Sequence, residues 1–113
     1  MTVRVAIATS NGRNVDEHFG RARSFRIYVL ENGSFKLLEG RESVPPCGGS
    51  QHDDQAMERL VDMLADCSAV AAAMIGPGAI DALLDRGVLP IALETSVDEA
   101  LATLQNSKFL RAH

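Results

Sequence analysis

The chain has 113 residues, 46% of them hydrophobic and 23% charged, a balance that is typical of a folded globular protein and excludes a disordered or fibrous one. We therefore expect one domain over residues 1–113. The formal net charge is -4, Trp is absent, and only one Tyr and four Phe are present. Nucleic-acid binding needs a basic face and stacking side chains, so we expect no nucleic-acid partner.

The charge is nevertheless uneven along the chain. Seven of the 11 Lys and Arg residues but only four of the 15 Asp and Glu residues lie in residues 1–41. This basic first third would attract an anionic small ligand. The sequence has no visible secretion signal, and its longest apolar run, residues 69–75, is too short to cross a bilayer. We expect a cytoplasmic protein without membrane contact.

The first part of the chain predicts three strands. Residues 3–9 are apolar and strand-like, and residues 25–30 and 34–39 flank Asn32-Gly33, a strong hairpin signal. The polar segment 10–23 between the first strand and the hairpin is expected to be an exposed loop.

A second loop and a helix follow. Pro and Gly residues in segment 44–49 exclude regular structure there. Ser50 with Asp53 predicts the start of a helix. One face of this helix carries the apolar residues Ala56, Met57, Leu60, Val61 and Leu64.

The last part alternates between strands and helices. Residues 69–75 predict a buried strand, and periodicity alone leaves a short buried helix as the alternative. Residues 79–86 predict a short helix, and residues 88–93 an edge strand, because Pro90 lacks a backbone donor. Ser96 with Glu99 is a capping box that opens a final helix. The whole order predicts an α/β fold whose mixed five-stranded sheet has an antiparallel hairpin and three flanking helices.

Three side chains suggest a metal site if the two loops meet in space. Cys47 and His52 belong to the second loop and the helix start, and His18 to the first loop. One thiolate and two imidazoles suit soft or borderline metals such as the iron of sulfur clusters. So few ligands would hold a cluster reversibly, which suits a carrier.

The arginines of the first loop add positive charge beside this set. Arg13, Arg21 and Arg23 could offset the negative charge of a sulfide-rich cluster. The other cysteine, Cys67, ends an apolar helical stripe and is expected to be a small core residue.

No catalytic constellation is apparent. Asp62 and Asp66 have spacings that predict solvent-facing positions, and the turn Gly76-Pro77-Gly78 lacks the residues of a phosphate loop. We therefore expect no enzyme activity.

The segments VAIAT, VDEHFGRARSF, PPCGGSQH and IGPGAIDALLDRGVLPI, in this order, resemble the dinitrogenase iron-molybdenum cofactor-binding family nearly end to end. The resemblance implies a ribonuclease H-like α/β fold and transient binding of an iron-sulfur cluster or iron-molybdenum cofactor or precursor. It also implies cofactor-assembly or acceptor proteins as partners, and we expect a monomer or weak homodimer.

By position in these motifs, the resemblance implies His18, Cys47 and His52 as metal ligands. The cofactor-binding residues that it implies are His18, Phe19, Gly20, Arg21, Cys47, Gly48 and Gly49.

Three functional hypotheses follow. The first is a cluster carrier for nitrogenase-type cofactor assembly. The second is a protein-binding or regulatory module of the same fold without metal. The third is a thiol enzyme with Cys47 as nucleophile and His52 or His18 as base.

Overall fold

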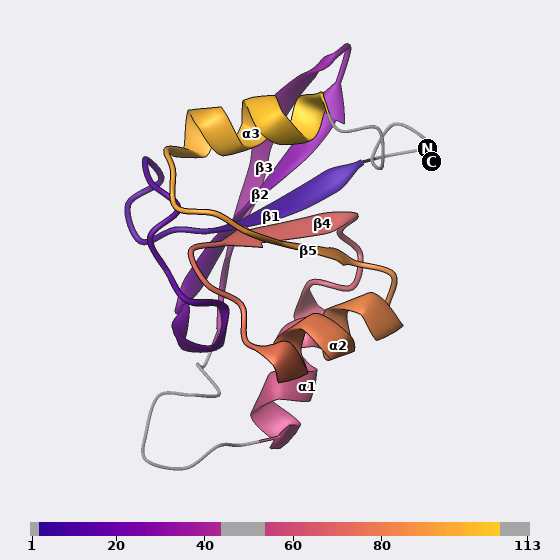
Figure 1. Ribbon diagram of the computed structural model, residues 1–113. Helices are drawn as coiled ribbons and strands as arrows, with labels where there is room; N and C mark the ends of the chain where they lie inside the picture. The colour runs from indigo at the N-terminus through magenta and orange to yellow at the C-terminus, as the bar shows by residue number, and fades with distance from the viewer. Residues whose placement is uncertain (1–2, 44–53, 107–113) are drawn as a thin grey trace.

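The computed structural model describes residues 3–43 and 54–106 (Figure 1). The order of elements is the predicted one. The five strands are β1 Arg4–Ala8, β2 Ser24–Glu31, β3 Ser34–Glu42, β4 Ala69–Ala72 and β5 Leu89–Ala92. The helices are the 3-10 turn η1 Phe19–Arg21 and the α-helices α1 Asp54–Met63, α2 Pro77–Asp85 and α3 Val97–Gln105.

The strands form one mixed sheet in the order β3-β2-β1-β4-β5. The pairs β1–β2 and β2–β3 are antiparallel, whereas β1–β4 and β4–β5 are parallel. Strand β1 is thus the point at which the sheet changes from antiparallel to parallel pairing. The prediction of β5 as an edge strand is confirmed, with Pro90 opposite Val70 of β4.

The two faces of the sheet are covered by different helices: α3 packs on one face, and α1 and α2 on the other (Figure 1). The pleat of β1 assigns its side chains to these faces alternately. Val5 and Ile7 join the core under α3, and Ala6 and Ala8 join the core under α1 and α2. All four are fully buried, so β1 is the centre of both cores.

Three boundaries differ from the prediction by two or three residues, and one of them is the end of β3, which lies at Glu42 and not at residue 39. Strand β4 ends at Ala72, because residues 73 and 74 bond instead to the segment around His18. Helix α2 starts at Pro77, which has no N–H and therefore removes one of the donors that the first turn of a helix leaves unpaired.

The expectation that segment 10–23 is an exposed loop was only partly right. Val15, Phe19 and Ala22 are buried at 2% exposure or less, and residues 19–21 form the turn η1. These apolar side chains fix the segment against the sheet.

The α-helices that the structure describes are nine or ten residues long, and none of them has the length and apolar character of a membrane span. The predicted capping pair of α1, Ser50 and Asp53, lies outside the described residues.

Candidate functional site

His18 lies just beyond the end of β4, in a segment bonded to that strand's continuation. The Ala73 amide donates to the Glu17 carbonyl at 2.9 Å. The Phe19 amide donates to the Met74 carbonyl at 2.8 Å, and His18 and Met74 form an isolated parallel bridge. His18 is therefore held at the carboxyl ends of the parallel strands, beside the point where sheet pairing changes, which is where α/β sheets commonly bind ligands.

The opposite side of the same segment is bonded to the connection between β5 and α3. The Val15 amide donates to the Thr95 carbonyl at 2.9 Å. The Val97 amide donates to the Arg13 carbonyl at 2.8 Å. Residues 13–19 are thus held on two sides by hydrogen bonds between backbone atoms.

The tight turn at the start of the segment depends on polar side chains and one glycine. The Asn11 carboxamide accepts from the amides of Arg13 and Asn14 at 2.8 and 3.1 Å. Gly12 has a φ of +77°, a conformation that side chains other than hydrogen disfavour. Asp16 closes the turn by accepting from the Ser10 amide at 2.9 Å.

Phe19 anchors the site from below. Its ring is fully buried and meets the ring of Phe25 edge-on, with centroids 5.8 Å apart and planes at 62°. Because Phe19 holds the middle of the segment in the core, the residues on either side, His18 and Gly20, stay at the surface.

A pocket of about 600 Å³ opens beside His18, between η1, α1 and the start of α2. Its charged side chains are Arg21 and Glu58, both exposed. The lining residues are His18, Gly20, Arg21, Met57, Glu58, Met74, Gly76, Pro77, Gly78 and Ala79.

The edge of this pocket formed by α2 carries no carboxylate. The helix has no acidic residue in its first turn, and its N-cap, Gly76, has no side chain to accept from the first amides. The helix dipole places partial positive charge at this end. Among the residues described, Arg21 has no ion-pair partner either. An anion in this pocket would therefore meet two sources of positive potential, Arg21 and the start of α2, which the carboxylate of Glu58 opposes.

A second pocket, of about 490 Å³, lies on the other side of His18. Its lining is more polar and includes Asp16 and Glu94. His18 lines both pockets and is exposed, so its imidazole is accessible from either side.

The structure brings together some of the predicted site residues. His18, Gly20 and Arg21 line the larger pocket, and Phe19 supports them from the core. Cys47, Gly48, Gly49 and His52 lie outside the described residues. Within the described ranges, no group of three or more His, Cys, Asp and Glu side chains is arranged to hold a metal ion. The described part of the site thus supplies one predicted ligand, His18, and a pocket.

The sequence prediction missed seven of the ten lining residues: Met57, Glu58, Met74, Gly76, Pro77, Gly78 and Ala79. Met57 was read as part of an apolar helix stripe and Met74 as part of a buried strand, whereas Met74 is 55% exposed. Glu58 had no distinguishing signal. The adjacency of Met74 to His18 depends on a backbone bridge that spacing does not reveal.

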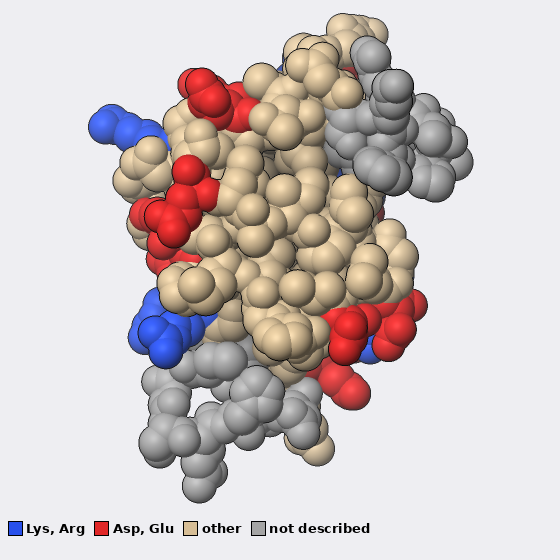
Figure 2. All heavy atoms as spheres, viewed as in Figure 1, with Lys and Arg blue, Asp and Glu red and all other residues tan. Residues whose placement is uncertain are grey.

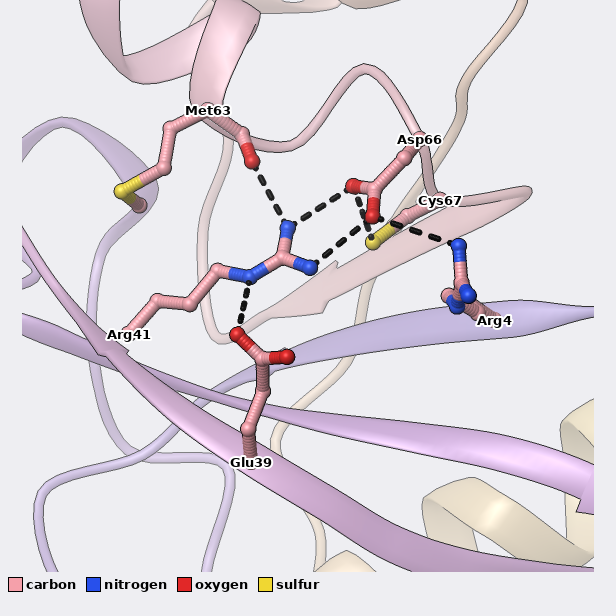
Figure 3. Close-up of polar contacts among 6 residues, drawn as sticks. All are labelled: Arg4, Glu39, Arg41, Met63, Asp66 and Cys67. Atoms are coloured by element: carbon pink, nitrogen blue, oxygen red, sulfur yellow. Dashed lines mark hydrogen bonds and ion pairs between the residues drawn. The ribbon is translucent and has the colours of Figure 1, made fainter.

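The prediction that Cys67 is a core residue is confirmed. Its side chain is buried below the turn after α1, next to the carboxylate of Asp66 (Figure 3). Burial, together with the Asp66 charge, raises the pKa of the Cys67 thiol to about 12. Cys67 is therefore a neutral thiol and a poor metal ligand or nucleophile.

Solved structures share this fold. The crystal structure of PH0822 superimposes with a TM-score of 0.70 at 24% identity, covering 91% of this chain and 90% of that one. The apo form of the orange protein from Desulfovibrio gigas has a TM-score of 0.64 at 22% identity, covering 89% and 85%.

Two curated proteins have a higher sequence identity to this chain than these solved structures. The FeMo cofactor biosynthesis protein NifB of Frankia alni is 36% identical over 105 residues, 90% of this chain but 21% of NifB. Protein NifX of Azotobacter vinelandii is 36% identical over 91 residues, 79% of this chain and 55% of NifX. The chain thus spans about a fifth of that NifB and about half of that NifX.

The model of the family described as "Dinitrogenase iron-molybdenum cofactor" matches residues 1–107, which is nearly the whole chain. The predicted resemblance is confirmed, and the chain belongs to the dinitrogenase iron-molybdenum cofactor family.

Proposed function

We propose that this protein binds an iron-sulfur cluster or iron-molybdenum cofactor, or a precursor of it, and carries it transiently during cofactor assembly. The observation that supports this most directly is the exposed imidazole of His18 at the mouth of the larger pocket. Family membership supports the cargo class, since relatives are named for biosynthesis of the FeMo cofactor.

The proposed cluster ligands are His18 and, from the sequence, Cys47 and His52, with Gly20, Arg21, Gly48 and Gly49 around the cargo. Imidazole and thiolate are suitable donors for iron in sulfur clusters. A site with few protein ligands would release its cargo to an acceptor.

We further propose a non-catalytic, cytoplasmic, single-domain protein that is a monomer or weak homodimer. Its partners would be cofactor-assembly or acceptor proteins. The mixed five-stranded sheet is compatible with the ribonuclease H-like classification, which stays a prediction.

The experiment is anaerobic reconstitution with an isolated cluster precursor, followed by gel filtration and analysis of iron, molybdenum and sulfide. The variants are His18→Ala and Cys47→Ala, and His113→Ala is the matched control for loss of an imidazole. We expect metal to comigrate with the wild type and with His113→Ala. His18→Ala and Cys47→Ala should lose most of it.

Circular dichroism would check that every variant is folded. A folded wild type that retains no metal would overturn the carrier proposal for that cluster. Equal metal on all four proteins would overturn the ligand assignment.

A protein-binding module without metal is the second candidate, and one observation favours it. A broad uncharged surface lies over β5 between α2 and α3 (Figure 2), and Leu84 of α2 is 53% exposed. The residues of β5, Leu89–Ala92, are all apolar and none of them is buried, and accessible apolar surface is typical of interaction sites. This candidate predicts that acceptor binding survives Cys47→Ser and is lost in Leu84→Asp, as measured by analytical ultracentrifugation.

A further inference from the structure

An uncharged surface runs along the edge strand β5, from the end of α2 to the second pocket (Figure 2). At its first end the Leu84 carbonyl accepts from the Gly87 amide at 3.0 Å, two residues before β5, and the Leu84 side chain is 53% exposed. At its other end, residues 94–96 follow β5 closely and line the second pocket. Leu84, residues 89–92 and the second pocket together are called the β5 surface below.

The outer edge of β5 is poorly suited to pairing with another strand. The amides of Leu89 and Leu93 donate to carbonyls of β4 and of the residue before it, at 3.0 and 2.9 Å. Amides of successive residues in a strand point to opposite edges, so positions 90 and 92 face outward. Position 90 is a proline and has no N–H. A partner must therefore bind the β5 surface through side chains and not by adding a strand.

The charge around the β5 surface is acidic. In residues 77–106 the one basic residue is Arg86, and it pairs with Asp62 of α1 at 2.6 Å. The same residues contain five exposed carboxylates, and none of the five pairs with a cation of residues 3–43 or 54–106. These carboxylates belong to Asp81, Asp85, Glu94, Asp98 and Glu99. Figure 2 shows acidic side chains at the borders of the uncharged area, so positive charges on a partner would complement them.

The second pocket concentrates this negative charge at one end of the β5 surface. Asp16 and Glu94 both line it. The Asp16 carboxylate accepts from the Ser10 amide at 2.9 Å and from the Ser10 hydroxyl, contacts that orient it and leave its charge in place. A pocket of about 490 Å³ accommodates the side chain of a lysine or arginine. Such a side chain would form charge-assisted hydrogen bonds with these carboxylates.

A second copy of this chain fits the β5 surface poorly. In a symmetric dimer the same surface patch contributes from both subunits, so the acidic border would face itself. Like charges placed opposite each other in an interface oppose association. Because Arg86 is already paired with Asp62, residues 77–106 supply no other cation to offset this repulsion. The charge therefore favours a different protein, with basic residues, as the occupant.

We propose that the β5 surface is the docking site of a partner protein that presents apolar side chains flanked by lysines or arginines, one of which enters the second pocket. His18 lines this pocket as well, so a partner bound here reaches the imidazole from the side opposite the larger pocket. The inference rests on the proposed function, since it names the surface on which a carrier would meet the protein that receives its cargo.

The test uses two synthetic amphipathic peptides with leucines at the same positions, one carrying lysine and the other glutamate at all remaining positions. Each is titrated into the isotope-labelled full chain, and the backbone amide signals are followed by NMR. The lysine peptide should bind at least about tenfold more tightly than the glutamate peptide at low salt, and added salt should weaken it. Its largest shifts should fall on residues 84–96. Equal affinities, or largest shifts on α1 or the β2–β3 hairpin, would overturn the proposal.

Two substitutions with matched controls separate the apolar and the charged contributions. Leu84→Ser should weaken binding of the lysine peptide about fivefold, whereas Leu38→Ser on β3, where the side chain is 46% exposed, should change it less than about twofold. Glu94→Gln should also weaken it about fivefold, and Glu42→Gln, at an exposed carboxylate of β3, less than about twofold. Equal effects within either pair would overturn the site.

Sedimentation of the chain alone tests the competing occupant. Any self-association of the wild type should be unchanged in Leu84→Ser. A dimer that forms in the wild type and is lost in Leu84→Ser would show that a second copy occupies the β5 surface, and it would overturn the proposed partner class.

The outcomes distinguish this inference from the carrier proposal. If the wild type retains the cluster precursor but the lysine peptide does not select the β5 surface, the inference fails and the carrier proposal stands. If the wild type retains no metal but the peptide binds the β5 surface as expected, the carrier proposal fails and the docking surface stands.

Discussion

Arg41 of β3 and Asp66, in the turn after α1, form a two-pronged ion pair across 25 positions of sequence (Figure 3). Arg41 Nη1 donates to Asp66 Oδ1 at 2.7 Å, and Nη2 donates to Oδ2 at 2.8 Å. The same Nη1 also donates to the Met63 carbonyl at 2.7 Å. The Arg41 side chain, only 17% exposed, thus ties the last strand of the hairpin to the end of the first helix.

Replacing Arg41 should lower the free energy of unfolding. Arg41→Met removes the ion pair and leaves the Met63 carbonyl without this donor, so we expect a loss of about 2 kcal/mol in urea denaturation. Lys36→Met on the same strand is the matched control, because the Lys36 side chain is 60% exposed and its pairing distance to Glu31 is 3.9 Å. It should change stability by less than about 0.5 kcal/mol. Equal effects of the two substitutions would contradict a structural role for Arg41.

The ion pair also predicts how the stability of the fold decreases at acid pH. The hydrogen bonds and charge of Arg41 hold the pKa of Asp66 below its ordinary value of 3.8. As the pH falls, the Asp66 carboxylate is therefore protonated in the unfolded chain before it is protonated in the folded one. The stabilisation by the ion pair is complete above pH 3.8 and is lost as the pH falls through the lowered pKa. Asp66→Asn should flatten the fall in urea midpoint over this range. A profile as steep as that of the wild type would show that other carboxylates control the acid limb.

The buried thiol of Cys67 predicts how the stability of the fold changes at alkaline pH. Because its thiol pKa is raised from 9.0 to about 12, the folded protein stays neutral at Cys67 where the unfolded chain ionises. The resulting stabilisation is present below pH 9.0 and is lost as the pH rises toward the raised pKa. In a Cys47→Ser background, iodoacetamide should label folded Cys67 at pH 8 at least about a hundredfold more slowly than the urea-unfolded chain. Comparable rates would mean that Cys67 is accessible in the folded state.

Substitution of two glycines with positive φ should distinguish an effect on stability from an effect on cargo binding. Gly12 begins the segment that carries His18, whereas Gly33 (φ +83°) turns the hairpin at the opposite end of the sheet. Gly12→Ala and Gly33→Ala should each cost about 1 kcal/mol of stability, because both impose a side chain on left-handed backbone. At Gly12 a Cβ would also overlap with the Arg26 guanidinium, so that group must move. Only Gly12→Ala should weaken cargo retention, as measured by the reconstitution assay, and an equal loss in Gly33→Ala would contradict this.

Much of the fold was predictable from the sequence. Asn32-Gly33 fixed the hairpin prediction, and Ser96 does cap the last helix, accepting from the Glu99 amide at 3.1 Å. Local signals of this kind act within a few residues, so spacing reveals them.

The tertiary partners of polar and sulfur side chains were not predictable. Asp66 was expected to face solvent, and its side chain is 40% exposed, but it is held by Arg41. Met74 has the same sequence signature as a core residue. In both cases the deciding contact joins residues far apart in the sequence, and one backbone bond or ion pair has no periodicity to detect.

The double attachment of residues 13–19 has a consequence for how fast and how tightly a cargo is taken up. With backbone bonds to β4's continuation on one side and to the β5–α3 connection on the other, the backbone that carries His18 is in place before any ligand arrives. Capture therefore requires little loss of backbone entropy in this segment, and affinity is not reduced by a folding step. The amides of Val15, Phe19, Ala73 and Val97 should accordingly exchange with deuterium as slowly in the empty protein as in the loaded one.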